Sequence, residues 1–150
     1  SSPATRNFVP STWSIRFDSN LISGKLSASK KSDERIGRPV VGSISPFPVS
    51  KSTIGSERLY SSIVTTAPRG RTRIHHHGEC ETSIYIVSGS ARYTWGPTGL
   101  EHEMRAGAGD FVYIPAGEIH VEENASDREP LVVVITRNCP GSVVHYLDEE

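Results

Sequence analysis

Histidines in two parts of this sequence could together bind a metal ion. His75, His76 and His77 are consecutive, and His120 follows much later. Side chains alternate along a β-strand, so His75 and His77 would face one way and His76 the other. Three imidazoles with a nearby carboxylate form a mixed N/O site that suits Fe(II), Mn(II), Ni(II), Zn(II) or Cu(II). The residues therefore predict one divalent metal ion and do not choose among these metals.

Short β-strands separated by turns must position these histidines. From residue 57 to 147 there are about eight segments rich in Val, Ile, Tyr and Thr, each bounded by Gly, Pro, Asn or Ser. The chain has 13 Gly and 10 Pro in 150 residues, which favours many short segments over long helices. The pattern predicts an all-β sandwich or barrel, and a jelly roll is the natural closure at this number of strands.

Residues 1–55 differ in composition from the rest of the chain. Ser is frequent there, and apolar residues occur in isolated short groups. We expect an N-terminal arm with short strands near 13–17 and 40–44 and a flexible loop, followed by a barrel over residues 56–150. A lone arm strand needs a sheet edge to pair with, either in its own chain or in a partner subunit. We therefore expect a homodimer to which the arm contributes.

Composition argues against nucleic-acid binding and a membrane span, and it indicates the state of the cysteines. The chain has 16 basic and 17 acidic residues, a net charge of −1, which argues against a nucleic-acid-binding protein. No segment approaches the ~18–20 consecutive apolar residues that a membrane span requires. Cys80 and Cys139 are too few for a disulfide framework, so we expect reduced thiols and a cytoplasmic protein; one disulfide between them is the alternative.

The histidines lie within two motifs that resemble those of the cupin superfamily. The second cupin motif, Gly-x5-Pro-x-Gly-x2-His-x3-Asn, is matched at every interval by Gly109, Pro115, Gly117, His120 and Asn124. The first motif places His-x-His ahead of a Glu and a Gly, here His75, His77, Glu81 and Gly89. The resemblance covers residues 57–147. It implies a small jelly-roll β-barrel with a metal ion in its mouth, bound by His75, His77, Glu81 and His120.

The first motif departs from the cupin pattern at its acidic residue. Seven residues separate Glu81 from Gly89 where the family has six, which places Thr82 at the usual position of the Glu. A β-bulge could realign Glu81 toward the metal, and we favour this interpretation because bulges are common where a strand presents a ligand. Otherwise the site would consist of three histidines and water. Glu79 is a second candidate for the same role.

Strand alternation indicates three further residues for the site. Arg73 shares a face with His75 and could orient a substrate carboxylate or phenolate through charge-assisted hydrogen bonds from its forked guanidinium. A salt bridge at the rim of the barrel is an alternative of equal weight. Glu122 shares a face with His120 and could act as a general base or orient a ligand histidine. Tyr85 shares a face with Glu81 and could donate a proton or simply fill the barrel.

Three classes of function fit these residues. The resemblance favours a metal-dependent enzyme acting on a small oxygen-bearing organic substrate. The first hypothesis is a dioxygen-dependent oxidation with Fe(II), making the protein an oxidoreductase of the dioxygenase type. The second is a non-redox isomerase, dehydratase, decarboxylase or cyclase in which the ion acts as a Lewis acid. The third is a binding protein that holds a small molecule without turnover. The sequence does not name the substrate.

Overall fold

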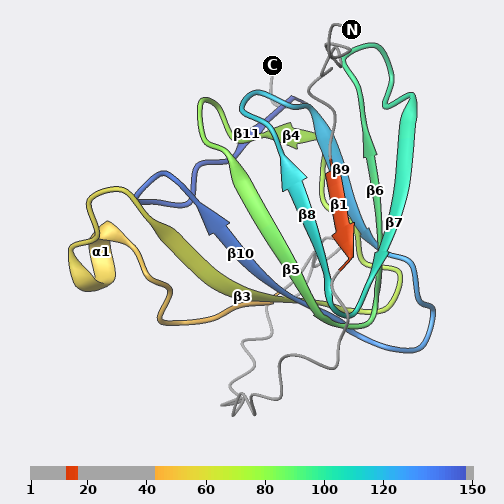
Figure 1. Ribbon diagram of the computed structural model, residues 1–150, viewed down its shortest axis with the longest axis horizontal. Helices are drawn as coiled ribbons and strands as arrows, with labels where there is room; N and C mark the ends of the chain where they lie inside the picture. Colours follow the sequence, from red (N-terminus) through yellow and green to blue (C-terminus); the bar gives the residue numbers. More distant parts are fainter. Residues whose placement is uncertain (1–12, 17–42, 148–150) are drawn as a thin grey trace, which may run out of the picture.

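Two antiparallel β-sheets face each other in the computed structural model, which describes residues 13–16 and 43–147 (Figure 1). The first sheet contains, in spatial order, β1 (Trp13–Arg16), β8 (Asp110–Ile114), β5 (Thr82–Ser88), β10 (Leu131–Arg137), β3 (Tyr60–Thr66) and β2 (Ser43–Ile44). The second contains β11 (His145–Tyr146), β4 (His75–His76), β9 (His120–Asn124), β6 (Ser90–Trp95) and β7 (His102–Gly107). The predicted all-β jelly-roll architecture is confirmed.

The core lies between the two sheets and follows from the alternation along each strand. In β10, every second residue from Leu131 to Arg137 is buried, and β8 alternates in the same way. Each fully buried Ile, Val or Leu contributes about 1.5–3 kcal/mol relative to an exposed one. The buried cluster consists of Ile84, Ile86, Ala91, Tyr93, Trp95, Ala106, Val112, Ile114, Leu131, Val133 and Ile135.

Strands of the predicted arm pair with the edges of the six-stranded sheet of the same chain. β1 pairs with β8 at one edge, and β2 pairs with β3 at the other. Most of the arm predicted over residues 1–55, including its loop, lies outside the described residues. One short helix was not expected: α1 (Lys51–Ile54) is capped by Ser50, whose side-chain oxygen accepts a hydrogen bond from the amide of Thr53.

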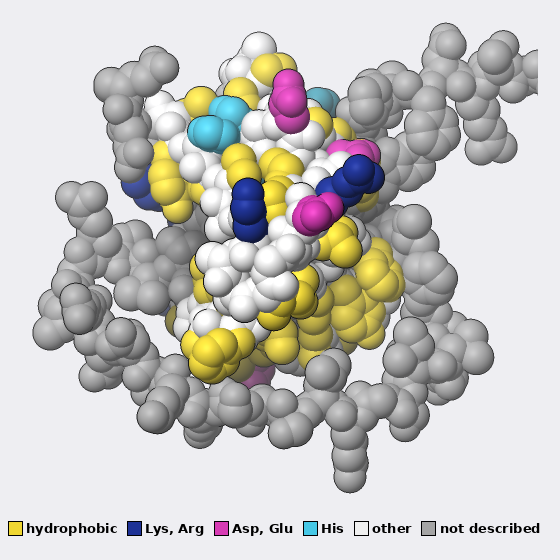
Figure 2. All heavy atoms as spheres, turned by 90° about the vertical axis from the view of Figure 1, so that its left-hand side faces the viewer, with side chains coloured by type: hydrophobic (Ala, Val, Ile, Leu, Met, Phe, Trp, Pro, Cys, Tyr) yellow, Lys and Arg dark blue, Asp and Glu magenta, His cyan; other side chains and the backbone are white. Residues whose placement is uncertain are grey.

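Large hydrophobic side chains are exposed in and after β2 and around α1. Phe47, Ile54 and Leu59 are 85%, 70% and 52% exposed. Figure 2 views the molecule from the side on which α1 lies and shows hydrophobic side chains over much of the lower half of this face. None of the helices in the described part of the chain has the length and apolar character needed to cross a membrane.

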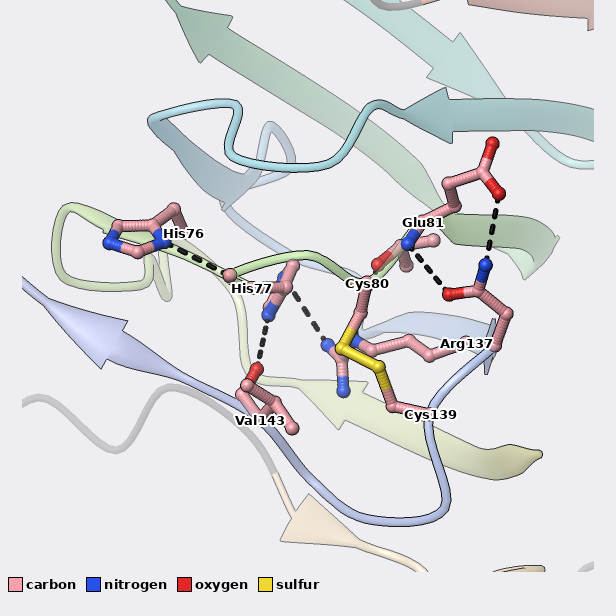
Figure 3. The surroundings of a disulfide bond; sticks show 10 residues. His76, His77, Cys80, Glu81, Arg137, Cys139 and Val143 are labelled. Atoms are coloured by element: carbon pink, nitrogen blue, oxygen red, sulfur yellow. Dashed lines mark hydrogen bonds between the residues drawn. A yellow bond between two sulfur atoms is a disulfide. The ribbon is translucent and has the colours of Figure 1, made fainter. Parts of the chain in front are cut away.

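A disulfide joins Cys80 to Cys139, which corrects the expectation of reduced thiols (Figure 3). The two residues are 59 apart in sequence, and the pairing of Thr82 with Arg137 between β5 and β10 brings them together. Their Cα atoms lie 5.8 Å apart, within the range that a disulfide spans. The cytoplasmic location expected from the sequence remains a prediction.

Candidate metal centre

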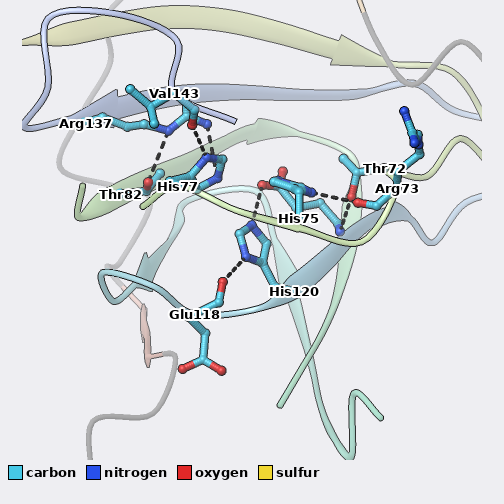
Figure 4. A network of polar contacts seen from close by, with 10 residues as sticks. Thr72, Arg73, His75, His77, Thr82, Glu118, His120, Arg137 and Val143 are labelled. Atoms are coloured by element: carbon cyan, nitrogen blue, oxygen red, sulfur yellow. Dashed lines mark hydrogen bonds and ion pairs between the residues drawn. The ribbon is translucent and has the colours of Figure 1, made fainter. Parts of the chain in front are cut away.

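Three histidines from two distant parts of the sequence meet inside the barrel (Figure 4). His75 in β4 pairs directly with His120 in β9, and His77 follows at the end of β4. The side chains are almost fully buried, and the ring centroids lie 4.3 Å (His75–His120), 4.8 Å (His75–His77) and 5.0 Å (His77–His120) apart. Glu122, on the same face of β9 as His120, completes a group whose possible ligand atoms all lie within 4.8 Å of one another.

Backbone carbonyl groups fix the orientation of all three imidazole rings. The Nδ1 of His75 donates to the carbonyl of Arg73 at 2.7 Å. The Nδ1 of His77 donates to the carbonyl of Val143 at 2.7 Å, and the Nδ1 of His120 to that of Glu118 at 2.8 Å. A neutral imidazole carries one N–H, so these bonds leave every Nε2 with a lone pair. This is the arrangement by which metal-binding histidines are oriented.

The contact between His120 and Glu122 requires a cation. The Nε2 of His120 is buried without a hydrogen-bond partner among the described residues, yet it lies 3.4 Å from the Oε1 of Glu122. With Nδ1 donating to Glu118, a neutral His120 turns a lone pair toward a carboxylate, and the two repel each other. Either a second proton on His120 or a metal ion between the two groups removes this repulsion. The residues present therefore fit a divalent metal ion.

Burial keeps His75 and His77 neutral, and the carboxylate of Glu122 stays charged. Burial lowers the pKa of His77 to about 3, assisted by the positive charge of Arg137 and by His120. Burial and the neighbouring His120 also lower the pKa of His75. Burial alone would raise the pKa of Glu122, but its contact with the ring of His120, followed by the nearby rings of His75 and His77, lowers it to about 2. Near neutral pH the group therefore contains the neutral rings of His75 and His77 beside an ionised carboxylate, and the Nε2 of His77 is in contact with Nη2 of Arg137.

Glu81, predicted as a metal ligand, lies outside this group. Its exposed carboxylate accepts hydrogen bonds from the hydroxyl of Tyr113 at 2.6 Å and from the side-chain amide of Asn138 at 2.9 Å. The inward face of β5 starts at Thr82, so Glu81, one residue earlier, faces the other way. The expected bulge at Glu81 is wrong, because the register irregularity between β5 and β10 lies at the opposite end of β5.

Tyr85, predicted as a proton donor, lies on the outer face for the same reason. Its ring packs against Phe111 with centroids 4.8 Å apart. Both rings line an open hollow of about 300 Å³ on the outside of the six-stranded sheet, together with Ser83, Val134 and Thr136. Glu79, the alternative acidic ligand, is exposed and is not part of the histidine group. Strand alternation therefore places Glu81 and Tyr85 outside the centre, and Glu79 lies in the turn between β4 and β5.

Arg73 and His76 also point away from the three imidazoles. The guanidinium of Arg73 lies over the ring of Tyr146, 4.4 Å from its centroid, and Figure 4 shows the side chain directed away from His75. Only the carbonyl of Arg73 serves the centre, as the hydrogen-bond acceptor for His75. His76 stacks on His145 with centroids 4.9 Å apart, as the alternation predicts.

Two inward residues of the centre were missed by the sequence interpretation. Arg137 ends β10 on the buried face, and its Nη2 lies 3.3 Å from the Nε2 of His77. Tyr93 in β6 stands directly opposite Glu122 in β9, is 1% exposed, and its hydroxyl has no partner among the described residues. The alternation of apolar residues from Leu131 onward could have placed Arg137 inside. Only the pairing of β6 with β9 places Tyr93.

The comparisons with a family model, with protein sequences and with solved structures agree on the kind of protein that this chain resembles. A family model described as a cupin domain matches residues 62–136. A probable oxalate decarboxylase of Arthroderma benhamiae is 33% identical over 87 residues, which are 57% of this chain and 20% of that protein. The oxalate decarboxylase of Lactobacillus farciminis, solved as a formate complex, superposes with a TM-score of 0.63 at 22% identity, over 74% of this chain and 32% of that chain.

Two structures of a Bacillus subtilis oxalate decarboxylase are similarly close. The structure at pH 4.6 gives a TM-score of 0.63 at 26% identity, over 73% of this chain and 28% of that chain. A structure concerned with the Mn(II) centres of the enzyme gives a TM-score of 0.62 at 25% identity, over 74% and 30%. The chain thus spans about a third or less of the length of the decarboxylases that it resembles.

Proposed function

The chain belongs to the cupin family, as its two motifs predicted, and on that premise we propose that it is a metal-dependent enzyme that decarboxylates a small carboxylic acid. One observation carries the proposal. Three buried imidazoles, each locked by a carbonyl group at Nδ1, turn their Nε2 atoms and the carboxylate of Glu122 toward a common point. Such a preorganised donor set is typical of a metal centre with open positions for substrate.

The proposed ligands are His75, His77, His120 and Glu122, with Glu122 in place of the predicted Glu81. Three imidazoles and one carboxylate suit Mn(II) or Fe(II). We favour Mn(II) over the Fe(II) expected first, because a similar B. subtilis decarboxylase has Mn(II) centres. When bound, the ion supplies Lewis acidity, which attracts a carboxylate and stabilises negative charge that develops in the reaction.

Tyr93 is the proposed source of the proton that decarboxylation requires. Loss of CO₂ from a carboxylate leaves an electron pair on carbon, and a proton must then be added there. Burial, followed by the charge of Glu122, raises the pKa of Tyr93 well above its usual value, so the phenol keeps its proton. Its buried hydroxyl has no hydrogen-bond partner among the described residues. Proton donors of this kind accelerate reactions by roughly 10²–10⁴-fold.

A dioxygen-dependent oxidation is the competing function. The donor set is equally compatible with Fe(II) chemistry, so the site residues do not separate the two reactions. The relatives named above are decarboxylases, and this favours a lyase over an oxidoreductase. The two functions differ in their requirement for oxygen, which makes them separable by experiment.

The test is metal reconstitution followed by assays with and without oxygen. Protein purified without added metal is loaded with Mn(II) and supplied with oxalate and other small mono- and dicarboxylic acids. We expect one bound Mn(II) per chain and release of CO₂ without stoichiometric oxygen uptake. Oxygen consumption with Fe(II) and no CO₂ release would instead favour the oxidation. Tight metal binding without any turnover would reject both enzymatic functions.

A pair of variants ties the metal to the proposed site. His120→Ala removes a ligand, and we expect loss of stoichiometric metal while the circular dichroism spectrum of the barrel is retained. His102→Ala, in which an exposed histidine of β7 is removed, should bind metal like the wild type. Full occupancy in His120→Ala would refute the proposed ligand set.

A further inference from the structure

Arg137 is a buried arginine fixed at the edge of the histidine group. Its side chain is 5% exposed, and its Nε donates to the hydroxyl of Thr82 at 3.2 Å. Its Cζ lies 5.6 Å from the ring centroid of Tyr60, which is itself buried. These contacts hold the base of the guanidinium, so its outer nitrogens have a defined position.

The guanidinium of Arg137 has no ion-pair partner within the described part of the chain. Among the described residues, no carboxylate forms an ion pair with Arg137. Glu122 acts on it only at longer range. A buried charge without a paired counter-charge is costly, and proteins usually compensate it with an anion. The barrel thus holds a buried cationic group that no carboxylate of residues 43–147 pairs with.

The contact of Arg137 with His77 is incompatible with a bound metal. Nη2 of Arg137 lies 3.3 Å from Nε2 of His77, and it uses the lone pair that a metal ion would take. When His77 coordinates a metal, this N–H donor loses its acceptor and lies beside the ion. An oxygen atom of a ligand bound to the metal on that side is then placed to accept a hydrogen bond from Nη2 of Arg137.

We propose that Arg137 binds the carboxylate of the substrate beside the metal ion, and that the substrate is therefore a small anion with a planar, two-oxygen carboxylate. This inference rests on the proposed function. A guanidinium presents two parallel N–H groups that match the two oxygens of a carboxylate. Thr82 holds the position at which the family motif has its Glu, and its hydroxyl orients Arg137 instead. Where the family motif has a metal-binding carboxylate, this chain thus has a hydroxyl group that positions the guanidinium of Arg137 for binding an anion.

The test measures metal and anion binding separately, without relying on turnover. Protein is loaded with Mn(II), and its affinity for formate and for oxalate is measured from the change in water-proton relaxation as the anion displaces metal-bound water. We expect Arg137→Gln to weaken the binding of both anions by at least about tenfold, because the substitution removes a charge-assisted hydrogen-bond donor. Mn(II) affinity should stay equal or increase, because a positive charge and a competitor for His77 are both removed.

Two further variants distinguish recognition from a structural role. Arg137→Lys keeps the positive charge but not the two parallel N–H donors of the guanidinium, and should bind the anions with intermediate affinity. Arg105→Gln, the same substitution at an exposed arginine of β7, should leave both affinities unchanged. Unchanged anion binding in Arg137→Gln would overturn the proposal, as would a fall in its Mn(II) affinity of more than about tenfold. If Arg137→Gln does not fold, wild-type anion affinity in Arg137→Lys overturns it. Failure of the wild type to bind Mn(II) would reject the proposed function itself.

Discussion

At the scale of single residues, the centre depends on which nitrogen of each histidine carries the proton. Hydrogen bonds from Nδ1 to carbonyl groups settle this for His75, His77 and His120 without any other side chain. The carboxylate of Glu122 then faces a lone pair on His120 at 3.4 Å. The metal-free protein is therefore electrostatically unfavourable at this point, and a metal ion or a proton relieves it.

His77 makes the stability of the metal-free protein depend on pH. Its pKa is about 3 when folded and near 6.5 when unfolded, so between these values the unfolded chain binds a proton that the folded chain does not. Acidification therefore favours unfolding. We expect urea denaturation to show a loss on the order of 1–2 kcal/mol between pH 7 and pH 5. His77→Asn should lose less over the same interval, and an equal loss in both proteins would contradict this assignment.

Removal of the Tyr93 hydroxyl should affect turnover and little else. Because the hydroxyl has no partner among the described residues, Tyr93→Phe removes no hydrogen bond from the fold, and we expect a change in unfolding free energy below about 1 kcal/mol. Decarboxylation should slow by about 10²-fold or more, with Mn(II) affinity unchanged. Tyr113→Phe, which removes a hydroxyl on the outer face, is the control and should turn over normally. Full activity in Tyr93→Phe would exclude it as the proton donor.

At the scale of elements, the disulfide joins the two connections that hold His77. Cys80 lies between β4 and β5, and its amide donates to the carbonyl of His77 at 3.1 Å. Cys139 lies between β10 and β11, the connection that also contains Val143, the acceptor for the ring of His77. Figure 3 shows the disulfide beside His77 and Arg137. The bond therefore fixes the distance between the backbone of His77 and the carbonyl that orients its ring.

Loss of the disulfide should weaken both the fold and the metal site. For the double variant Cys80→Ser/Cys139→Ser we expect a decrease of about 2–4 kcal/mol in the unfolding free energy, since the bond closes a long loop. We also expect severalfold weaker Mn(II) binding, measured by isothermal titration calorimetry. Treatment of the wild type with a reductant should reproduce both effects, and the double variant should not respond to it. Wild-type Mn(II) affinity in the double variant would show that the disulfide does not contribute to the metal site.

At the scale of the whole molecule, the proposed metal ligands come from two elements that are distant in sequence. His75 and His77 belong to β4 and its end, while His120 and Glu122 belong to β9, and all lie between the two sheets. An ion held by both strands stabilises only the folded barrel, because the unfolded chain does not bring these ligands together. The homodimer expected from the sequence remains a prediction at this scale.

Metal binding should therefore raise the stability of the entire barrel. At a free Mn(II) concentration of 100 times the dissociation constant, the stabilisation is about 2.7 kcal/mol. We expect a clear increase in the melting temperature of the metal-free wild type on addition of Mn(II), reversed by a chelator. His120→Ala should show no such increase, and an equal shift in that variant would place the stabilising ion elsewhere.

The sequence by itself determined the strands, the jelly-roll class and the three histidines, because turn residues, alternation and motif spacing are local properties. The sequence interpretation was wrong where a shift of one residue along a strand changes the face on which a side chain lies. Glu81 and Tyr85 lie outside, whereas Thr82 faces inward. Arg137, Tyr93 and the disulfide enter the account only through pairing between strands far apart in the chain. The tertiary structure thus decided the composition of the centre, because long-range strand pairing sets which side chains share one enclosed space.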